Sequence, residues 1–234
     1  MNILLILLTV VMSIGVGWSI GANDAANSLG TAVGSRVLTL KRAIILICVF
    51  GFIGAFLQGS HVAKTIGKGI VPLDQLDKNL SLYIALIASF AACVWVVIAT
   101  SWKIPISTSH SIVGAVAGAG LAAGATVKWK VLFDIFICWI FTPLGSAVLG
   151  FIFYQIFKSL FYRFVPRKYL KSSLAVLIII SGCYVAYSWG TNDVANATGV
   201  MVGAGVFTPT VSIVIGAAAI LLGIFTWGYK VIET

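Results

Sequence analysis

Apolar runs divide this sequence into seven segments that are separated by short polar stretches. Most of the runs are about 20 residues long, which is the length of an α-helix that crosses a lipid bilayer. The alternating segments of about ten residues that build a membrane β-barrel do not occur. The pattern therefore predicts an all-α polytopic membrane protein. The runs are 3–22, 43–60, 80–101, 104–125, 131–157, 173–190 and 210–228.

Two of these runs contain an interruption that suggests a broken or re-entrant helix. The letters "KIPISTSH" occupy 103–110, and "TPLGSA" occupies 142–147. If the runs 43–60 and 80–101 each cross the membrane, then 104–125 and 131–157 must both cross it or must both re-enter and return. The pattern leaves these two topologies open.

The charges indicate which loops face the cytoplasm. The chain is 60% hydrophobic and 9% charged, and its net charge is +9. Basic residues lie between the apolar runs, at Lys41 and Arg42 and in the loop 158–171, as in the cytoplasmic loops of membrane proteins. This distribution predicts a multi-pass protein of the cell membrane, embedded in lipid, with its N-terminus outside. No surface for nucleic acid is indicated.

An internal repeat organises the chain. The segment "GANDAANSLG" at 21–30 is matched by "GTNDVANATG" at 190–199, a shift of 169 residues, and identities continue in the same register to Thr65 and Thr234. The first copy starts from outside and the second from the cytoplasm, so the repeats are predicted to be inverted, as in many secondary transporters. We expect a first repeat at 1–157, a basic cytoplasmic loop at 158–171, and the start of a second, incomplete repeat at 172–234.

The repeated segment places carboxylates inside the membrane. Asp24 and Asp193 are functional candidates, because an intramembrane charge is energetically costly. Asn23 and Asn27 lie near the face of Asp24 on a helix, and Asn192 and Asn196 repeat that arrangement. Buried asparagine can also simply join helices to one another. The duplication favours a binding site.

A second group of polar residues follows a proline in the segment "PISTSHS", 105–111. Pro105 suits a helix start. Ser107, Thr108 and Ser109 would then lie at a helix N-terminus, where free N–H groups and the helix dipole favour an anion. Helix capping alone would need one of these hydroxyl groups, so three in a row favour a functional role.

Together these motifs resemble the inorganic phosphate transporter family of cation-coupled symporters. The resemblance rests on "GANDAANSLGTAVGSRVLTLKRA", "GTNDVANATG", "PISTSH" and the final "WGYKVIET". It departs from the family at Arg36, Ser109 and Thr191, and a second Pro-x-Ser-Thr-Thr-His motif is absent. The resemblance implies a central site for phosphate and a cation, formed by Asn23, Asp24, Asn27, Ser107, Thr108, Ser109, Asn192, Asp193 and Asn196.

The chemistry of these side chains suits an anion that binds together with a cation. Carboxylate and amide oxygens are ligands for Na⁺, and Asn23, Asp24, Asn192 and Asp193 are the candidates. The amide N–H groups can donate to phosphate. A carboxylate can also accept the proton of a phosphate P–OH group, which sulfate lacks. We therefore expect phosphate symport with Na⁺ or H⁺, without any other cofactor.

Three alternatives stay open at this point. The chain could transport another oxyanion such as sulfate, or it could be a non-transporting membrane subunit. Two membrane aspartates could also form the dyad of an intramembrane protease, although their Asn-rich surroundings argue against an enzyme. Because the second repeat is incomplete, we expect this chain to transport poorly unless a homo-oligomer or a partner supplies the missing helices.

Overall fold

The computed structural model describes residues 3–102, 104 and 106–228, apart from the side chain of Tyr162, and this part of the chain is helical without strands. Six of its helices are long and apolar enough to cross a membrane, and the short α4 is the exception. This confirms the predicted all-α polytopic class. The helices are α1 (Ile3–Gly34), α2 (Leu40–Lys64), α3 (Lys78–Ser101), α4 (Thr108–Ala122), α5 (Trp129–Phe164), α6 (Arg167–Gly203) and α7 (Pro209–Gly223).

Short non-α turns extend two of these helices and precede a third. α2 continues into a π-helical turn at Thr65–Gly69, and α7 continues into another at Ile224–Gly228. A 3-10 turn at Leu73–Gln75 precedes α3, whose first N–H groups are capped by the carboxylate of Asp77. Residues 62–79, between the apolar runs 43–60 and 80–101, are therefore largely helical, because α2 continues past its apolar stretch.

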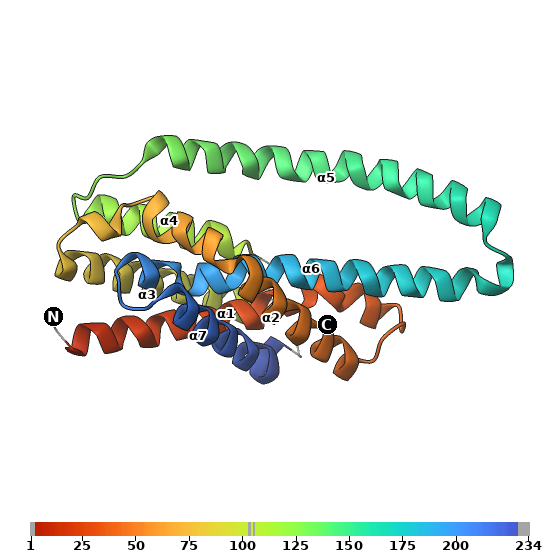
Figure 1. Cartoon of the computed structure of the whole chain (residues 1–234), viewed down its shortest axis with the longest axis horizontal. Coiled ribbons are helices and arrows are strands. Elements are labelled where there is room, and N and C mark those ends of the chain that lie inside the picture. The colour runs from red at the N-terminus through yellow and green to blue at the C-terminus, as the bar shows by residue number, and fades with distance from the viewer. Residues whose placement is uncertain (1–2, 103, 105, 229–234) are drawn as a thin grey trace.

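The bundle has two ends, and its helices alternate between them. We call the end where α1 begins the α1-start end, and the opposite end, where α2 begins, the α2-start end. α1 runs from the first to the second, and α6 runs in the reverse direction (Figure 1). α7 runs alongside α1 in the same direction, since Gly17 lies near Ala219 and Gly21 near Ile220. The two copies of the repeated segment thus lie on oppositely directed helices, as an inverted repeat predicts.

Helices of the two repeats pack against one another. α1 packs along α7 and α2 packs along α6, so the first helix of each repeat lies against the second helix of the other. A Cβ atom added to Gly54 would overlap the carbonyl oxygen of Tyr187, and one added to Gly223 would overlap that of Trp18. The shift of 169 residues relates these two contacts. It also relates the contact of Gly21 with Ile220 to that of Gly190 with Gly51.

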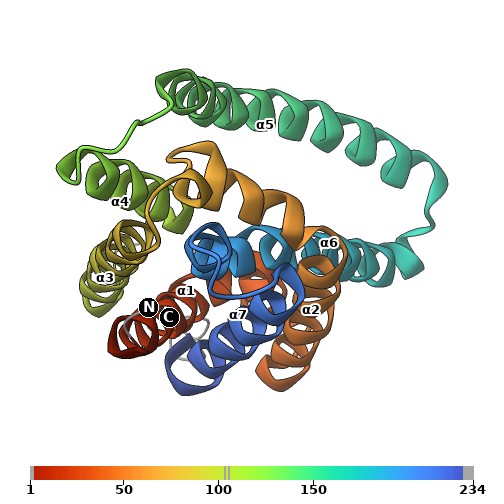
Figure 2. The same ribbon diagram turned by 60° about the vertical axis from the view of Figure 1, so that its left-hand side comes forward.

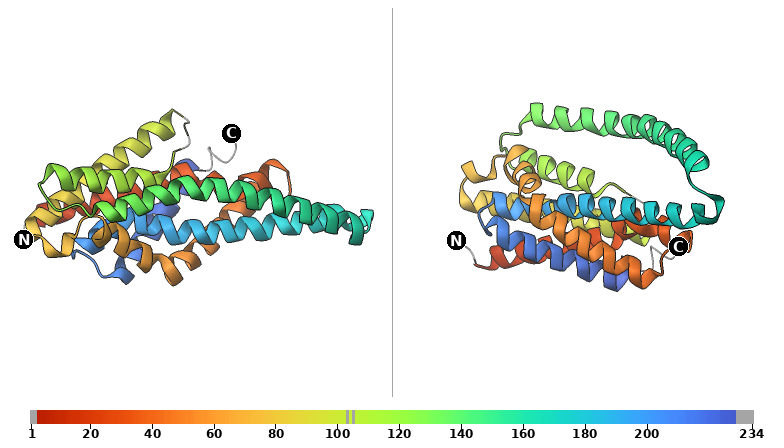
Figure 3. Two further views of the ribbon diagram at one scale, coloured as in Figure 1. Left: turned by 90° about the horizontal axis from the view of Figure 1, so that it is seen from above. Right: turned by 45° about the vertical axis from the view of Figure 1, so that its right-hand side comes forward.

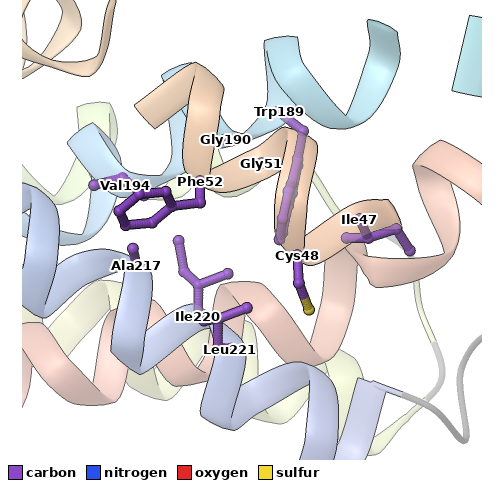
Figure 4. A pocket seen from close by; sticks show the side chains of 10 residues that line it. All are labelled: Ile47, Cys48, Gly51, Phe52, Trp189, Gly190, Val194, Ala217, Ile220 and Leu221. Atoms are coloured by element: carbon purple, nitrogen blue, oxygen red, sulfur yellow. The ribbon is translucent and has the colours of Figure 1, made fainter. Parts of the chain in front are cut away.

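Glycine is required where α2 and α6 cross. A Cβ atom on Gly190 would overlap the backbone of Gly51, so a larger residue would force the two helices apart. Figure 4 shows the Trp189 side chain lying along α2 next to Gly51 and Cys48. The ring fills the space beside this glycine crossing and holds the α6 backbone close to α2.

α3 and α4 form a hairpin that ends inside the bundle. The Asn23 side chain donates to Thr100 Oγ1 at 2.8 Å, so the last turn of α3 is level with Asn23, whereas α1 continues to Gly34. α4 then starts beside Asp24 and returns to the α1-start end. The hairpin therefore turns back at the level of Asn23 and Asp24, although α3 is long and apolar enough to cross a membrane. Which of the segments 80–101, 104–125 and 131–157 cross the bilayer stays a prediction.

α5 differs from the sequence-based expectation in two ways. It is continuous from Trp129 to Phe164 with Pro143 inside it, so the interruption expected at 142–147 is absent. Neighbouring groups or water can satisfy the backbone that a proline frees in a membrane helix. The basic segment 158–171 is also helical rather than a loop: Val165 and Pro166 alone separate α5 from α6.

α5 stands apart from the other helices along most of its length (Figures 2 and 3). Leu132, Ile135 and Trp139, near its start, pack against the core, and the Trp139 ring lies 3.7 Å from the His110 ring, measured between centroids. The remainder of the helix exposes large apolar side chains, as expected for a surface that faces lipid.

Candidate functional site

The two Asn-Asp segments lie in the interior of the bundle on unbroken helices. Asp24 lies ten residues before the end of α1, and Asp193 ten residues before the end of α6. Ten residues correspond to about 15 Å of helix. Because α1 and α6 run in opposite directions, the two carboxylates lie deep within the bundle, each about 15 Å from the C-terminal end of its own helix.

The helices are continuous through both signatures, although glycine and alanine flank the polar residues there. This regular helix engages the backbone carbonyl groups of both signatures within α1 and α6. Side-chain oxygens are therefore the ligands that this site can offer.

In the first signature, each asparagine has a different partner. Asn27 donates to Asp24 Oδ1 at 2.9 Å. Asn23 donates to Thr100 Oγ1 on α3. Thr100 in turn donates to the carbonyl oxygen of Val96. The first bond orients the carboxylate, and the second fixes the α3 end of the hairpin against α1.

In the second signature, both asparagines reach the hairpin. Asn192 and Asn196 donate to Ser109 Oγ at 2.9 and 2.8 Å. Asn196 also lies 3.1 Å from Asp193 Oδ1, which repeats the bond between Asn27 and Asp24. Ser109 accepts both amide bonds, so its own O–H group can still donate to a bound ligand.

Thr108 joins the two signatures. Its hydroxyl group donates to Asp24 Oδ2 at 2.9 Å and lies 3.4 Å from Asp193 Oδ1. The two carboxylate oxygens are thus at most 6.3 Å apart, the sum of these distances. Both carboxyl groups are buried, with 6% and 3% of their residues' surface exposed. One hydroxyl group on the hairpin therefore connects carboxylates that are 169 residues apart in the sequence.

The three hydroxyl residues have separate roles in this geometry. Ser107 caps α4, and its Oγ accepts the N–H of His110 at 3.3 Å. Thr108 contacts both carboxylates, and Ser109 contacts both asparagines of the second signature. Capping thus accounts for one hydroxyl group and leaves two for the site. Pro105, which the sequence placed at this helix start, lies outside the described residues.

The electrostatics of this pair favour a bound cation or proton. Two negative charges about 6 Å apart repel by roughly 3 kcal/mol at an effective dielectric constant of about 20. Among the described side chains, Asp193 Oδ2 and Asn196 Oδ1 are buried acceptors without a hydrogen-bond partner. Unpaired buried acceptors are costly, and a cation or a proton would satisfy them.

A cavity of about 350 Å³ reaches this pair from the α2-start end. On α6 its lining lies mostly before Asp193, at Val185, Ser188 and Trp189, and on α1 it includes Asn27. On the other side of the carboxylates, Ile20, Ile112, Met201 and their neighbours form a closed apolar cluster with exposures near zero. The site is thus open toward the α2-start end and sealed toward the α1-start end.

Sequence reasoning missed two residues at this site. Thr100 holds Asn23 but looked like part of an apolar run, and no local pattern distinguished it. Trp189 lines the cavity, and its indole N–H is buried without a partner among the described atoms. A tryptophan placed immediately before the second signature was the available signal.

Comparisons with known proteins place this geometry in a family. The model of the phosphate transporter family matches residues 20–234. A solved structure of a sodium-dependent phosphate transporter superposes with a TM-score of 0.87 at 28% identity, and the match covers 99% of this chain and 77% of that one.

Two relatives differ in how their length compares with this chain. A protein of Thermococcus kodakarensis, provisionally named a phosphate permease, is 31% identical over 98% of this chain and 76% of its own length. That alignment extends over 309 residues, so the relative has internal residues without a counterpart among the 234 here. The sulfate permease CysP of Bacillus subtilis is 35% identical over 97% of this chain and 63% of its own, in an alignment of 239 residues. By the extent of the family match, this chain belongs to the phosphate transporter family.

Proposed function

We propose that this chain binds inorganic phosphate together with a cation at the Thr108-bridged carboxylates and carries both across the membrane. The observation behind this proposal is the convergence of two buried aspartates, four asparagines and two hydroxyl groups beside a cavity that is open at one end. Membership in a transporter family sets aside the protease alternative, since that family and its solved relative are transporters rather than enzymes.

The anion would bind where the donors converge. The Ser109 hydroxyl group, the Asn27 and Asn192 amides and the first turn of α4 border the cavity. The free N–H groups at the start of α4 favour negative charge. An aspartate beside this position would accept the proton of a phosphate P–OH group. A carboxylate repels an anion that has no proton, but it can accept a hydrogen bond from protonated phosphate.

The coupling cation would be Na⁺ or H⁺. The side-chain oxygens of Asp24, Asp193 and Asn196 are hard ligands of the kind that Na⁺ takes, and two of them lack partners. A proton shared between the carboxylates would relieve the same repulsion. The name of a mouse relative, a sodium-dependent phosphate transporter that is 37% identical over 80% of this chain, favours Na⁺.

Sulfate is a second candidate for a specific reason. The alignment with the sulfate permease CysP extends over 239 residues and so needs few insertions relative to the 234 residues here, whereas the Thermococcus alignment needs many additional internal residues. The internal architecture of this chain therefore resembles that of the sulfate permease more closely. Against sulfate stands the aspartate pair, because sulfate at neutral pH has no proton to donate to a carboxylate.

The proposed orientation follows from the charges. The described basic residues Arg36, Lys41 and Arg42 and the α5–α6 connection lie at the α2-start end, so this end is proposed to be cytoplasmic and the N-terminus outside. The cavity would then be open to the cytoplasm. A homo-oligomer or a partner chain is part of the proposal, since this chain spans 76% of the length of the Thermococcus relative and 77% of the solved transporter chain.

Equilibrium binding tests which anion the chain binds, before transport is measured. Purified protein in lipid nanodiscs is titrated with radiolabelled phosphate in Na⁺ and in choline at pH 6 and pH 8, and unlabelled sulfate is added as a competitor. We expect saturable phosphate binding that requires Na⁺ or low pH and resists excess sulfate. Tight sulfate binding with weak phosphate binding would support the second candidate, and binding of neither anion would contradict the site. Uptake into proteoliposomes then tests transport.

A further inference from the structure

An apolar groove lies between α2 and α6 on the outside of the bundle, away from the proposed phosphate site. Its volume is about 700 Å³. Leu46, Phe50 and Ile53 form its α2 wall, and they follow one another at helical spacing on one face. Its α6 wall consists of Ile179, Ile180, Cys183, Tyr184 and Tyr187. The side chains are largely apolar, and Ile180 and Tyr184 are 59% and 70% exposed.

The basic side chain of Arg42 lies at the end of the α2 wall. Arg42 lies four residues before Leu46, so its side chain leaves α2 on the same face as the groove. Helical side chains lean toward the N-terminus of their helix, which directs the Arg42 guanidinium out of the groove toward the membrane surface. Arg42 is exposed and has no ion pair within the described part of the chain.

The described charged residues near the Arg42 end of the groove are basic. The described acidic residues outside the central pair are Asp74, Asp77 and Asp134, and all three lie at the α1-start end. The α2-start end has basic residues on α2, α5 and α6. An occupant with a negative head would be attracted to this end, and a zwitterionic or cationic one would gain less.

The dimensions suit one lipid chain. The α2 wall extends from Leu46 to Ile53, which is about 10 Å of helix. One leaflet of the hydrocarbon core is about 15 Å deep. A groove of this length, with a cation where the leaflet meets the headgroups, matches an acyl chain that is joined to a phosphate. We propose that this groove binds an anionic phospholipid of the leaflet at the α2-start end, with its phosphate on Arg42 and an acyl chain between α2 and α6.

Native mass spectrometry of the full chain, released from detergent, tests this proposal. The protein is titrated with phosphatidylglycerol or with phosphatidylcholine of the same acyl chains. Arg42→Gln removes the proposed phosphate partner. Lys171→Gln is the matched control, since it removes one charge at the same end from the face of α6 opposite Ile180. We expect retention of one phosphatidylglycerol that Arg42→Gln weakens about fivefold, the effect of one basic side chain near an anionic surface.

A second pair of variants tests the acyl chain. Ile180→Trp fills the groove and should reduce phosphatidylglycerol retention, whereas Ile87→Trp, at an exposed position on α3, should leave it unchanged. Thermal unfolding shows whether each variant is folded. Equal weakening by Arg42→Gln and Lys171→Gln, or equal retention of the two lipids by the wild type, would overturn the proposal. A lipid-free dimer that Ile180→Trp disrupts would overturn it too, since a second copy would then cover the groove.

Discussion

Replacing Thr108 with valine tests the bridge between the two halves of the site. Valine has nearly the same shape as threonine but lacks the hydroxyl group that donates to Asp24 Oδ2 and lies near Asp193 Oδ1. A hydrogen bond to a charged group contributes about 1.5–3 kcal/mol. If the bridge is needed to hold both carboxylates around the ligand, phosphate binding should weaken roughly 10- to 150-fold.

Phosphate binding in nanodiscs is measured at several Na⁺ concentrations and at two pH values. Thr108→Ser keeps the hydroxyl group and should bind nearly as the wild type does. Ser111→Ala is the matched control on the same helix, because the half-buried Ser111 donates to the backbone carbonyl oxygen of Ser107 rather than to an aspartate. It should leave phosphate affinity unchanged.

Folded Thr108→Val that binds phosphate as tightly as the wild type, with the same dependence on Na⁺ and pH, would contradict a role of the bridge in binding. That result would mean that the hydroxyl bridge belongs to helix packing rather than to the site. A loss of affinity in Thr108→Ser as large as that in Thr108→Val would also contradict it, because the serine hydroxyl group should restore the bond.

Three further expectations follow from the site and the fold. Asp24→Asn and Asp193→Asn should each abolish cation-dependent phosphate binding while the protein remains inserted, as measured by the same titration and by membrane fractionation. Gly54→Ala and Gly223→Ala should each destabilise the protein by about 1–3 kcal/mol, because their new methyl groups overlap backbone carbonyl groups at equivalent helix crossings; thermal unfolding measures this. A cysteine at Arg167, in a variant without native cysteines, should react with impermeant reagents in inverted vesicles and stay unlabelled in intact cells.

Each of these expectations has an outcome that would contradict it. Normal phosphate binding by both asparagine variants would remove the carboxylates from the site. Gly145→Ala is the control for the glycine variants, since an added Cβ atom there meets nothing within 4 Å; equal unfolding temperatures for all three variants would argue against close crossings. Labelling at position 167 from outside intact cells would reverse the proposed orientation.

The sequence predicted the site better than the path of the chain. Asp24, Asp193 and the hydroxyl run were recognisable because polar groups inside apolar runs are rare and their duplication excludes chance. The structure places these residues together, and their role in binding stays a prediction. Thr100 was missed because a single threonine in an apolar segment is usually a packing residue, and only its neighbours in space make it part of the site.

The depth of the α3–α4 hairpin could not be read from hydropathy. A run of apolar residues reports that a segment lies in lipid or protein, but it does not report where along the membrane normal the segment stops. α3 looks like a complete crossing by length, yet its end is held at the level of Asn23 by a side-chain bond. The basic residues of 158–171 likewise suggested a loop, although arginine and lysine also extend a helix beyond the bilayer when their charged ends stay in water.

The exchange of helices between repeats has a consequence for biosynthesis. α1 packs along α7, and about 175 residues separate the end of one from the start of the other. At a synthesis rate of about 5–20 residues per second, α1 waits roughly 10 to 35 seconds for this partner. During the first part of that time Asp24 lies in the membrane before Thr108 has been made, and during most of it before Asp193 has been made. We therefore expect the insertion machinery to shield α1, and the most polar part of the protein to be assembled late.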